Sequence, residues 1–222
     1  MTRFDPAVDR YDAFCAMPLG AWVNTIERQM VRTLLDLRRG ERVDLGCGTG
    51  AYALWARMGC AVVGVDESAA RLAKARGLLD SDGVWWAHGD LTHLPGTRAS
   101  FDVGLMQVVM EVVDEPQSAL HEAWRVIKPG GRLVVGLIHG TGPSGSGLGV
   151  SRGPFLDSVR INLGLEPAGV QGGLYVNPHE FLNSEQAWAL KHARSRRVEN
   201  AGFVAVGYGH DPQADTGREG TP

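Results

Sequence analysis

Short apolar runs alternate with helix-like patterns along the middle of the chain, and no other feature constrains the fold as strongly. Strands are predicted at 42–45, 61–65, 84–87, 103–109 and 132–138. Helices are predicted between several of these strands, at 51–58, 69–79 and 116–127. Because a helix is the usual crossover between parallel strands, this order predicts an α/β fold. We expect a Rossmann-like open, mostly parallel sheet with helices on both faces.

Composition and charge favour a small-molecule partner. With 222 residues and 44% hydrophobic content, the chain is long enough for one globular domain. Its 22 basic and 25 acidic residues give a net charge of −3, so no global field attracts nucleic acid or an anionic membrane. No signal-like or membrane-spanning run is recognisable, and we expect a cytoplasmic protein. The three cysteines lack metal-ligand spacing, so no metal site is expected.

The glycine-rich segment 46–50, Gly-Cys-Gly-Thr-Gly, lies between the first predicted strand and the helix that follows it. Glycines at such a turn let the backbone approach a ligand closely, which is typical of a cofactor-binding loop. The spacing of Gly46, Gly48 and Ala51 also fits the dinucleotide fingerprint. Asp44, however, suits the ammonium group of S-adenosylmethionine (SAM) and would repel a pyrophosphate. This acid therefore favours SAM over NAD.

Two further acids follow predicted strands. Asp66, with Glu67 beside it, comes 22 residues after Asp44 (66 − 44), near the spacing at which an acid binds a ribose diol. Asp90, followed by Leu91, ends the third predicted strand and is placed to accept from an adenine amino group. Any one of these aspartates alone could merely cap the next helix. Three in register favour a nucleoside site.

These elements, with Phe101-Asp102-Val103 and the segment 127–133 (Ile-Lys-Pro-Gly-Gly-Arg-Leu), resemble class I SAM-dependent methyltransferases of the type 11 group. The resemblance covers about residues 42–137. The first 40 residues, the leader, are similar to the N-terminal segment that covers the cofactor in one branch of the group. The similarity lies in Tyr11-Asp12-Ala13-Phe14, in residues 18–23 and in Glu27 on the helix that follows.

The resemblance implies a role for each matching residue. Asp44 and the 46–50 loop, with the backbone of Gly46, Gly48 and Gly50, would hold the methionine part of SAM. Asp66 would hold the ribose, and Asp90 and Leu91 the adenine. Closing the fourth strand, Gln107 and Val108 would flank the sulfonium.

The resemblance also implies a domain organisation. A single methyltransferase domain is expected over 1–209, with a helical cap at 1–40 and a SAM-binding core at 41–138. Residues 139–200 would cover the acceptor pocket, and the polar tail at 210–222 is expected to be disordered. The family sheet ends in two antiparallel strands, of which only one, at 203–208, is recognisable. The sequence leaves open whether the last antiparallel strand is present.

Methyl transfer from SAM depends chiefly on aligned approach and exclusion of water. Glu111 and His139 follow the fourth and fifth predicted strands and are candidate general bases, although a solvated loop role is the alternative for each. Cys47 is expected to pack beneath the glycine turn, and Trp85 and Trp86 to pack on opposite faces of their strand. The acceptor is expected to be a small molecule.

Two other functions stay open on sequence grounds. A non-catalytic or decayed SAM-binding protein is suggested by the short first strand, where only Val43 separates Arg42 from Asp44, and by the unrecognised final strand. An NAD-dependent oxidoreductase is disfavoured because Asp44 fits it poorly and the chain has no Tyr-x-x-x-Lys pair.

Overall fold

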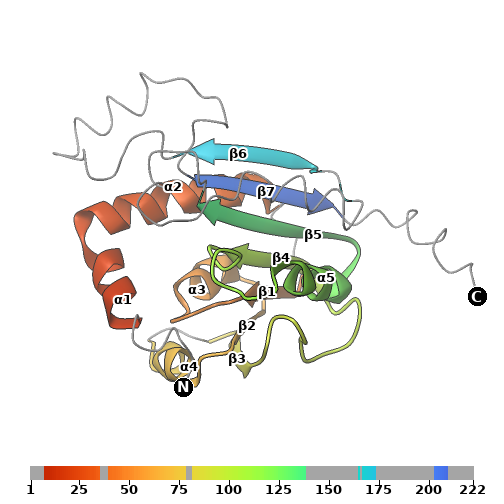
Figure 1. The fold of residues 1–222 in the computed structure, drawn as a ribbon, viewed down its shortest axis with the longest axis horizontal. Helices are drawn as coiled ribbons and strands as arrows, with labels where there is room; N and C mark the ends of the chain where they lie inside the picture. Colours follow the sequence, from red (N-terminus) through yellow and green to blue (C-terminus); the bar gives the residue numbers. More distant parts are fainter. Residues whose placement is uncertain are drawn as a thin grey trace, which may run out of the picture.

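A single mixed sheet forms the centre of the molecule (Figure 1). The computed structural model describes residues 8–35, 40–78, 82–138, 165, 167–173 and 203–209. Within these residues the strands are β1 Arg42–Leu45, β2 Val62–Asp66, β3 Val84–His88, β4 Phe101–Gln107, β5 Ile127–Ile138, β6 Gly169–Gly173 and β7 Phe203–Gly209. The helices are α1 Val8–Ala16, α2 Pro18–Leu34, α3 Ala51–Arg57, α4 Ala69–Arg76 and α5 Pro116–Val126.

The strand order is β3-β2-β1-β4-β5-β7-β6. β1 pairs in parallel with both β2 and β4, and the pairs β2–β3 and β4–β5 are parallel as well. β7 is antiparallel to both β5 and β6. The predicted Rossmann-like, mostly parallel sheet with helices on both faces is therefore confirmed.

The strand that the sequence did not reveal is β6, which lies upstream of β7 and forms the edge of the sheet. Three of its five residues are glycine, and they carry no side chains from which a strand pattern could be read. The short β1 is firmly built, because all four of its residues are buried. Buried Arg42 donates through Nη1 to the carbonyl of Ala56 on α3. Both observations that suggested a decayed protein are thereby removed.

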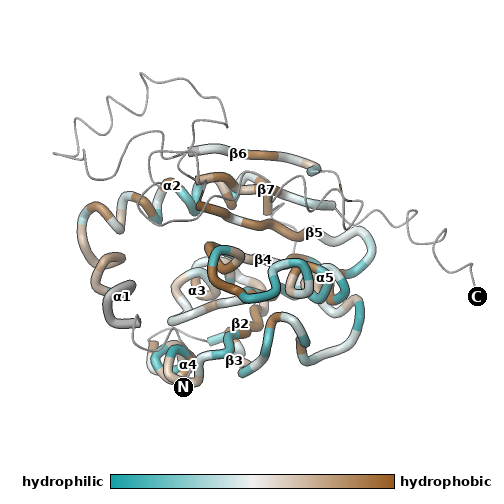
Figure 2. Tube along the Cα trace, viewed as in Figure 1, coloured by the Kyte–Doolittle hydropathy of each residue, from teal (hydrophilic) through white to brown (hydrophobic). Residues whose placement is uncertain are grey.

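The two faces of the sheet bury different helices. On one face, α2 and α3 cover residues such as Val103 and Leu105 of β4. On the other, α5 packs against alternate residues such as Met106. This alternation explains why β4 is apolar on both sides. Figure 2 shows β5, its neighbour in the sheet, as hydrophobic along much of its length.

Three local expectations are refined or corrected by the structure. Within the helical cap expected at 1–40 there are two helices, α1 and α2; α2 ends at Leu34, and residues 36–39 lie outside the described residues. β5 begins at Ile127 rather than at 132, because Gly130, at φ 79°, lets the chain turn without leaving the sheet. Trp85 does not pack: it is 59% exposed on the edge strand β3, whereas Trp86 lies on the opposite, covered side.

Candidate active site

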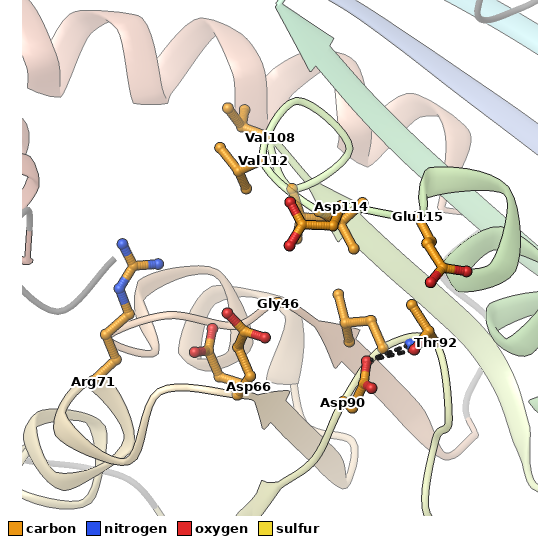
Figure 3. A pocket seen from close by; sticks show the side chains of 13 residues that line it. Gly46, Asp66, Arg71, Asp90, Thr92, Val108, Val112, Asp114 and Glu115 are labelled. Atoms are coloured by element: carbon orange, nitrogen blue, oxygen red, sulfur yellow. Dashed lines mark hydrogen bonds between the residues drawn. The ribbon is translucent and has the colours of Figure 1, made fainter. Parts of the chain in front are cut away.

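A cavity of about 250 Å³ opens at the carboxyl ends of the parallel strands, where the chain order reverses between β1 and β4. Ligands of open α/β sheets bind at such a switch point. Six of the residues predicted from sequence line this cavity: Gly46, Asp66, Glu67, Asp90, Leu91 and Val108. The prediction that acids after β2 and β3 share one site therefore agrees with the geometry (Figure 3).

The glycine loop after β1 has a backbone that other residues rarely adopt. Gly46, Gly48 and Gly50 have φ angles of 77°, 56° and 91°. A β-carbon on Gly46 would overlap the side chain of Val109, and one on Gly50 would lie 2.5 Å from the ring of Trp86. Both the left-handed backbone and the lack of space require glycine here. The loop is thus shaped for a close approach to a ligand, although only Gly46 of the three lines the cavity.

Asp66 joins the glycine loop to the start of α4. Its Oδ2 accepts from the backbone N–H of Gly48 at 2.8 Å, and its Oδ1 accepts from the N–H of Ser68 at 2.9 Å. Although Asp66 is buried, it lines the cavity. Ser68 in turn caps α4 by accepting from the N–H of Arg71. A carboxylate held from both sides is pre-positioned for a polar ligand group.

Asp44 lies beneath the loop and is 1% exposed, so it does not line the cavity. Its Oδ2 is buried without a hydrogen-bond partner. Burial, and then the charge of Asp66, raise the pKa of Asp44 to about 7, while the backbone N–H of Ala53 acts in the opposite direction. An unsatisfied buried acceptor of this kind is complementary to a cation in the loop above it.

Asp90 and Leu91 form the opposite end of the cavity, beyond β3. Asp90 Oδ1 accepts from both the N–H and the hydroxyl of Thr92, each at 2.8 Å. These bonds hold the pKa of Asp90 below its usual value. Leu91 is buried and supplies an apolar surface beside the exposed carboxylate. Figure 3 shows Asp90 and Thr92 together at this end of the cavity.

Gln107 is buried at the end of β4, and beside it Val108 has a φ of 51°. Gln107 Nε2 donates to the hydroxyl of Tyr52 at 3.5 Å, and that hydroxyl donates to Glu27 Oε2 at 2.7 Å. From the sequence, Glu27 was recognisable only as part of a similar leader segment, and Tyr52 was not recognisable as a site residue. The two residues are 25 positions apart on different helices and meet only through packing.

The two candidate general bases do not line the cavity within the described residues. Glu111 Oε1 accepts from the backbone N–H of Ile138 at 2.7 Å, which ties the turn after β4 to the end of β5. His139 lies outside the described residues. The geometry of Glu111 is that of a structural link, with its charge close to Glu27.

Several lining residues were missed from sequence: Arg71, Thr92, Val109, Val112, Val113, Asp114 and Glu115. Arg71 is the one cation among the described lining residues. The valines make one wall apolar, and Asp114 and Glu115 add acids to the rim (Figure 3). A site with this excess of carboxylates favours a positively charged ligand.

Cys47 is buried under the turn, as expected. Burial raises the pKa of its thiol, and the charges of Asp44 and Asp66 raise it further. The thiol is therefore not an activated nucleophile.

Known proteins are similar to this chain in sequence and in fold. A family model described as a methyltransferase domain matches residues 43–135. A demethylmenaquinone methyltransferase of Clavibacter sepedonicus is 34% identical over 177 residues, which are 75% of this chain and 67% of the relative. The chain belongs to the class I SAM-dependent methyltransferases. SAM, not NAD, is accordingly its cofactor, and the oxidoreductase alternative is set aside.

Two more similarities bear on this methyltransferase. A malonyl-[acyl-carrier protein] O-methyltransferase of Enterobacter lignolyticus (strain SCF1) is 34% identical over 115 residues, and the match spans 50% of this chain but only 45% of the relative. The crystal structure of a SAM-dependent methyltransferase from Thermotoga maritima, described as a possible histamine N-methyltransferase, superposes with a TM-score of 0.75. It is 26% identical, with 94% of this chain and 98% of that chain covered.

None of the helices described is long and apolar enough to span a membrane. Among the residues that the structure describes, no group of three or more His, Cys, Asp or Glu side chains is arranged to hold a metal ion.

Proposed function

We propose that this methyltransferase binds SAM across the switch-point cavity and methylates a small-molecule acceptor. The observation that carries the proposal is Asp66, held between the glycine loop and α4 with its carboxylate at the cavity. When bound, SAM supplies an electrophilic methyl group on a positively charged sulfur. The carboxylates around the cavity are complementary to that charge.

The roles follow the order of the strands. Asp44, under the 46–50 loop, would balance the ammonium of the methionine part, since its Oδ2 lacks a partner. At the end of β2, Asp66 and Glu67 would hold the ribose hydroxyls, as acids at this position do in related folds. The adenine would lie at Asp90 and Leu91, where a carboxylate stands beside an apolar side chain.

The sulfonium end would lie at Gln107 and Val108, next to the apolar wall after β4. The N-terminal helices would cover the methionine end. This is supported by Asp12 of α1, which accepts from Thr49 in the loop at 2.9 Å and from Lys74 of α4 at 3.2 Å. The expected cap over the core is consistent with these contacts.

The names of the similar proteins indicate different chemical classes of acceptor. One is named for demethylmenaquinone, and the structural neighbour is described as a possible histamine methyltransferase. Both names specify small molecules. The apolar wall with Val108, Val109 and Val112 suits an aromatic or aliphatic body in either case.

Calorimetric titration tests the cofactor part of the proposal. The full chain should bind SAM with micromolar affinity and should not bind NAD. Asp66→Asn should weaken SAM binding at least about tenfold, because a charge-assisted hydrogen bond is worth about 1.5 to 3 kcal/mol. Asp82→Asn, at an exposed position away from the cavity, is the matched control and should bind like the parent. Equal SAM affinity in Asp66→Asn and the parent would contradict the proposed site.

Release of S-adenosylhomocysteine tests turnover. A panel containing a quinol and several amines should yield this product with at least one acceptor. SAM binding without product from any class of acceptor would instead support a non-catalytic binder.

A further inference from the structure

A buried polar cluster lies next to Val108 and comprises Glu27 of α2, Tyr52 of α3 and Gln107 of β4. We call it the Glu27 cluster. None of its three residues lines the cavity itself. Its three side chains are 7%, 8% and 8% exposed. The Tyr52 hydroxyl connects them, since it donates to Glu27 and accepts from Gln107. A carboxyl, a phenol and a carboxamide within an apolar helix–sheet interface are costly to bury without a use.

The cluster adjoins the cavity through Val108. This valine follows Gln107 directly, lines the cavity, and packs against the hydrophobic cluster that contains Tyr52. Asp90 and Leu91 are separated from the cluster by β1 and β2 in the strand order. The Glu27 cluster is therefore at the end of the site opposite to the proposed adenine position.

The cluster offers hydrogen-bond acceptors to a ligand. Gln107 Oε1 is buried without a partner, and Glu27 in its ionised form only accepts hydrogen bonds. Glu111 adds a second negative charge, while the nearby cation is Arg28. The Arg28 guanidinium carbon lies 5.2 Å from the centre of the Tyr52 ring, and its Nη2 donates to the carbonyl of Ala51 at 3.1 Å. A ligand complementary to these groups carries hydrogen-bond donors and a positive charge.

We propose that the Glu27 cluster receives the reacting amino group of the acceptor, and that the Glu27 carboxylate takes one proton from it. This inference rests on the proposed function. The step is a proton transfer: an N–H bond of the bound ammonium breaks, an O–H bond forms on Glu27, and the nitrogen keeps the electron pair as its nucleophilic lone pair.

An amine is favoured over a phenol on electrostatic grounds. The negative charges of Glu27 and Glu111 favour binding of an ammonium ion over binding of a neutral phenol, and they oppose formation of a phenolate. They also raise the pKa of the bound ammonium, so Glu27 has to take its proton before the nitrogen can react. The substrate class that fits is thus a small amine with an apolar body, because the wall beside Val108 is apolar.

The proton affinity of Glu27 suits this role. Burial raises its pKa to about 7, and the charge of Glu111 acts in the same direction, while hydrogen bonds from Tyr52 and Gln107 and the charge of Arg28 oppose it. A group with such a pKa can both hold and release a proton near neutral pH. Binding of an ammonium ion should ionise the protonated fraction of Glu27 and so release protons near neutral pH.

Titration of the full chain saturated with S-adenosylhomocysteine tests the proposal. The probes are histamine and 2-phenylethylamine, with 2-phenylethanol as the neutral analogue. At least one amine should bind at least tenfold more tightly than the alcohol. Repeating the titration in buffers of different ionisation enthalpy should show net proton release near pH 7. Binding of neither amine, or equal binding of the alcohol, would overturn the proposal.

Glu27→Gln locates the effect. This isosteric variant should lose at least tenfold in amine affinity and release no proton, with S-adenosylhomocysteine affinity changed less than twofold. Glu41→Gln, an exposed acid that pairs with Lys128, controls for the change in net charge. Lost S-adenosylhomocysteine binding with intact amine binding would assign Glu27 to the cofactor and refute the inference. Failure of the parent chain to bind SAM would instead refute the proposed function.

Tyr52→Phe is the second variant, in case Glu27→Gln does not fold. It removes the hydroxyl that donates to Glu27 while keeping the ring under Arg28. Proton release should persist, with its pH midpoint shifted upward, because Glu27 loses a bond that stabilises its charged form. An unchanged midpoint would contradict the role given to the cluster.

Discussion

The carboxamide of Gln107 on β4 occupies the space that a β-carbon on Gly136 of β5 would need. The two residues are register partners in adjacent parallel strands. A long polar side chain can therefore lie over the neighbouring strand and reach the hydroxyl of Tyr52. Gly136, which lines no part of the cavity, controls the position of a residue proposed to act there.

Gly136→Ala should displace Gln107 and weaken both folding and amine binding. Because the added carbon meets a well-packed interior, we expect the free energy of unfolding to fall by about 1 to 3 kcal/mol. Gly77→Ala is the matched control. Gly77 caps α4 at φ −83°, and a β-carbon there would be no nearer than 3.4 Å to its neighbours. Urea unfolding of both variants measures the change in the free energy of unfolding. Equal values for the two variants would show that Gln107 can move aside without loss of stability.

Asp44→Asn should change how stability depends on pH. The folded pKa of Asp44 is raised to about 7, above the unfolded value of about 4, so the folded state retains a proton that the unfolded state loses. Stability of the parent should therefore fall as pH rises from about 4 to about 7. Asparagine removes this contribution, so between pH 4 and pH 8 the stability of the variant relative to the parent should rise by on the order of a few kcal/mol.

Urea unfolding at several pH values, without SAM, measures the effect. Glu27 has a similarly raised pKa and should leave part of the slope in place. SAM affinity of Asp44→Asn should fall, because the carboxylate under the loop no longer carries charge. A variant whose stability changes with pH as steeply as that of the parent would show that Asp44 is not buried as a titrating acid.

Trp85 and Trp86 should respond differently to truncation although they are neighbours in sequence. Trp85→Ala should alter the free energy of unfolding by no more than about 0.5 kcal/mol, because the ring is largely exposed. Trp86→Ala should cost about 3 kcal/mol, because its ring covers Gly50 and Gly64. Thermal melting of the pair makes the comparison. Similar losses in both would place Trp85 in an interface.

Cys47 should resist alkylation in the folded protein. Burial raises the pKa of its thiol, whereas Cys15 and Cys60 are partly exposed. Iodoacetamide should therefore modify Cys15 and Cys60 first, and Cys47 only after denaturation, as read by peptide mass spectrometry. Cys47→Ala should retain SAM affinity within about threefold, since a small apolar residue fills the same space. Rapid modification of native Cys47 would contradict this assignment.

The parallel half of the fold was predictable because the central strands β1, β2 and β4 are short, mostly buried segments, whereas the edge strand β3 leaves Trp85 exposed. β1 was placed at its observed bounds, and β2, β3 and β4 within two residues at each end. β6 could not be found, because Gly169–Gly173 has almost no side chains to show a pattern. The helix α1 also went unrecognised, since its residues lack a clear apolar stripe.

The candidate site was predictable where strand ends alone decide it. Asp66 and Asp90 follow strands, and parallel strands bring their carboxyl ends to one edge. Arg71 could have been inferred, because it lies in the first turn of the helix after Asp66. The contact between Glu27 and Tyr52 could not, since it depends on how two distant helices pack on the sheet.

The strand order reverses between β1 and β4, so the two walls of the cavity come from two separate parts of the chain. Asp66 and Leu91 belong to the part before β4, and Val108 and Asp114 to the part after it. A ligand that touches both walls holds the two parts together and stabilises the whole sheet, by about 2.7 kcal/mol at one hundred times its Kd. The folded fraction, and with it resistance to proteolysis, then rises with the supply of methyl donor. The lifetime of the protein in a cell should therefore be longest where the concentration of SAM is highest.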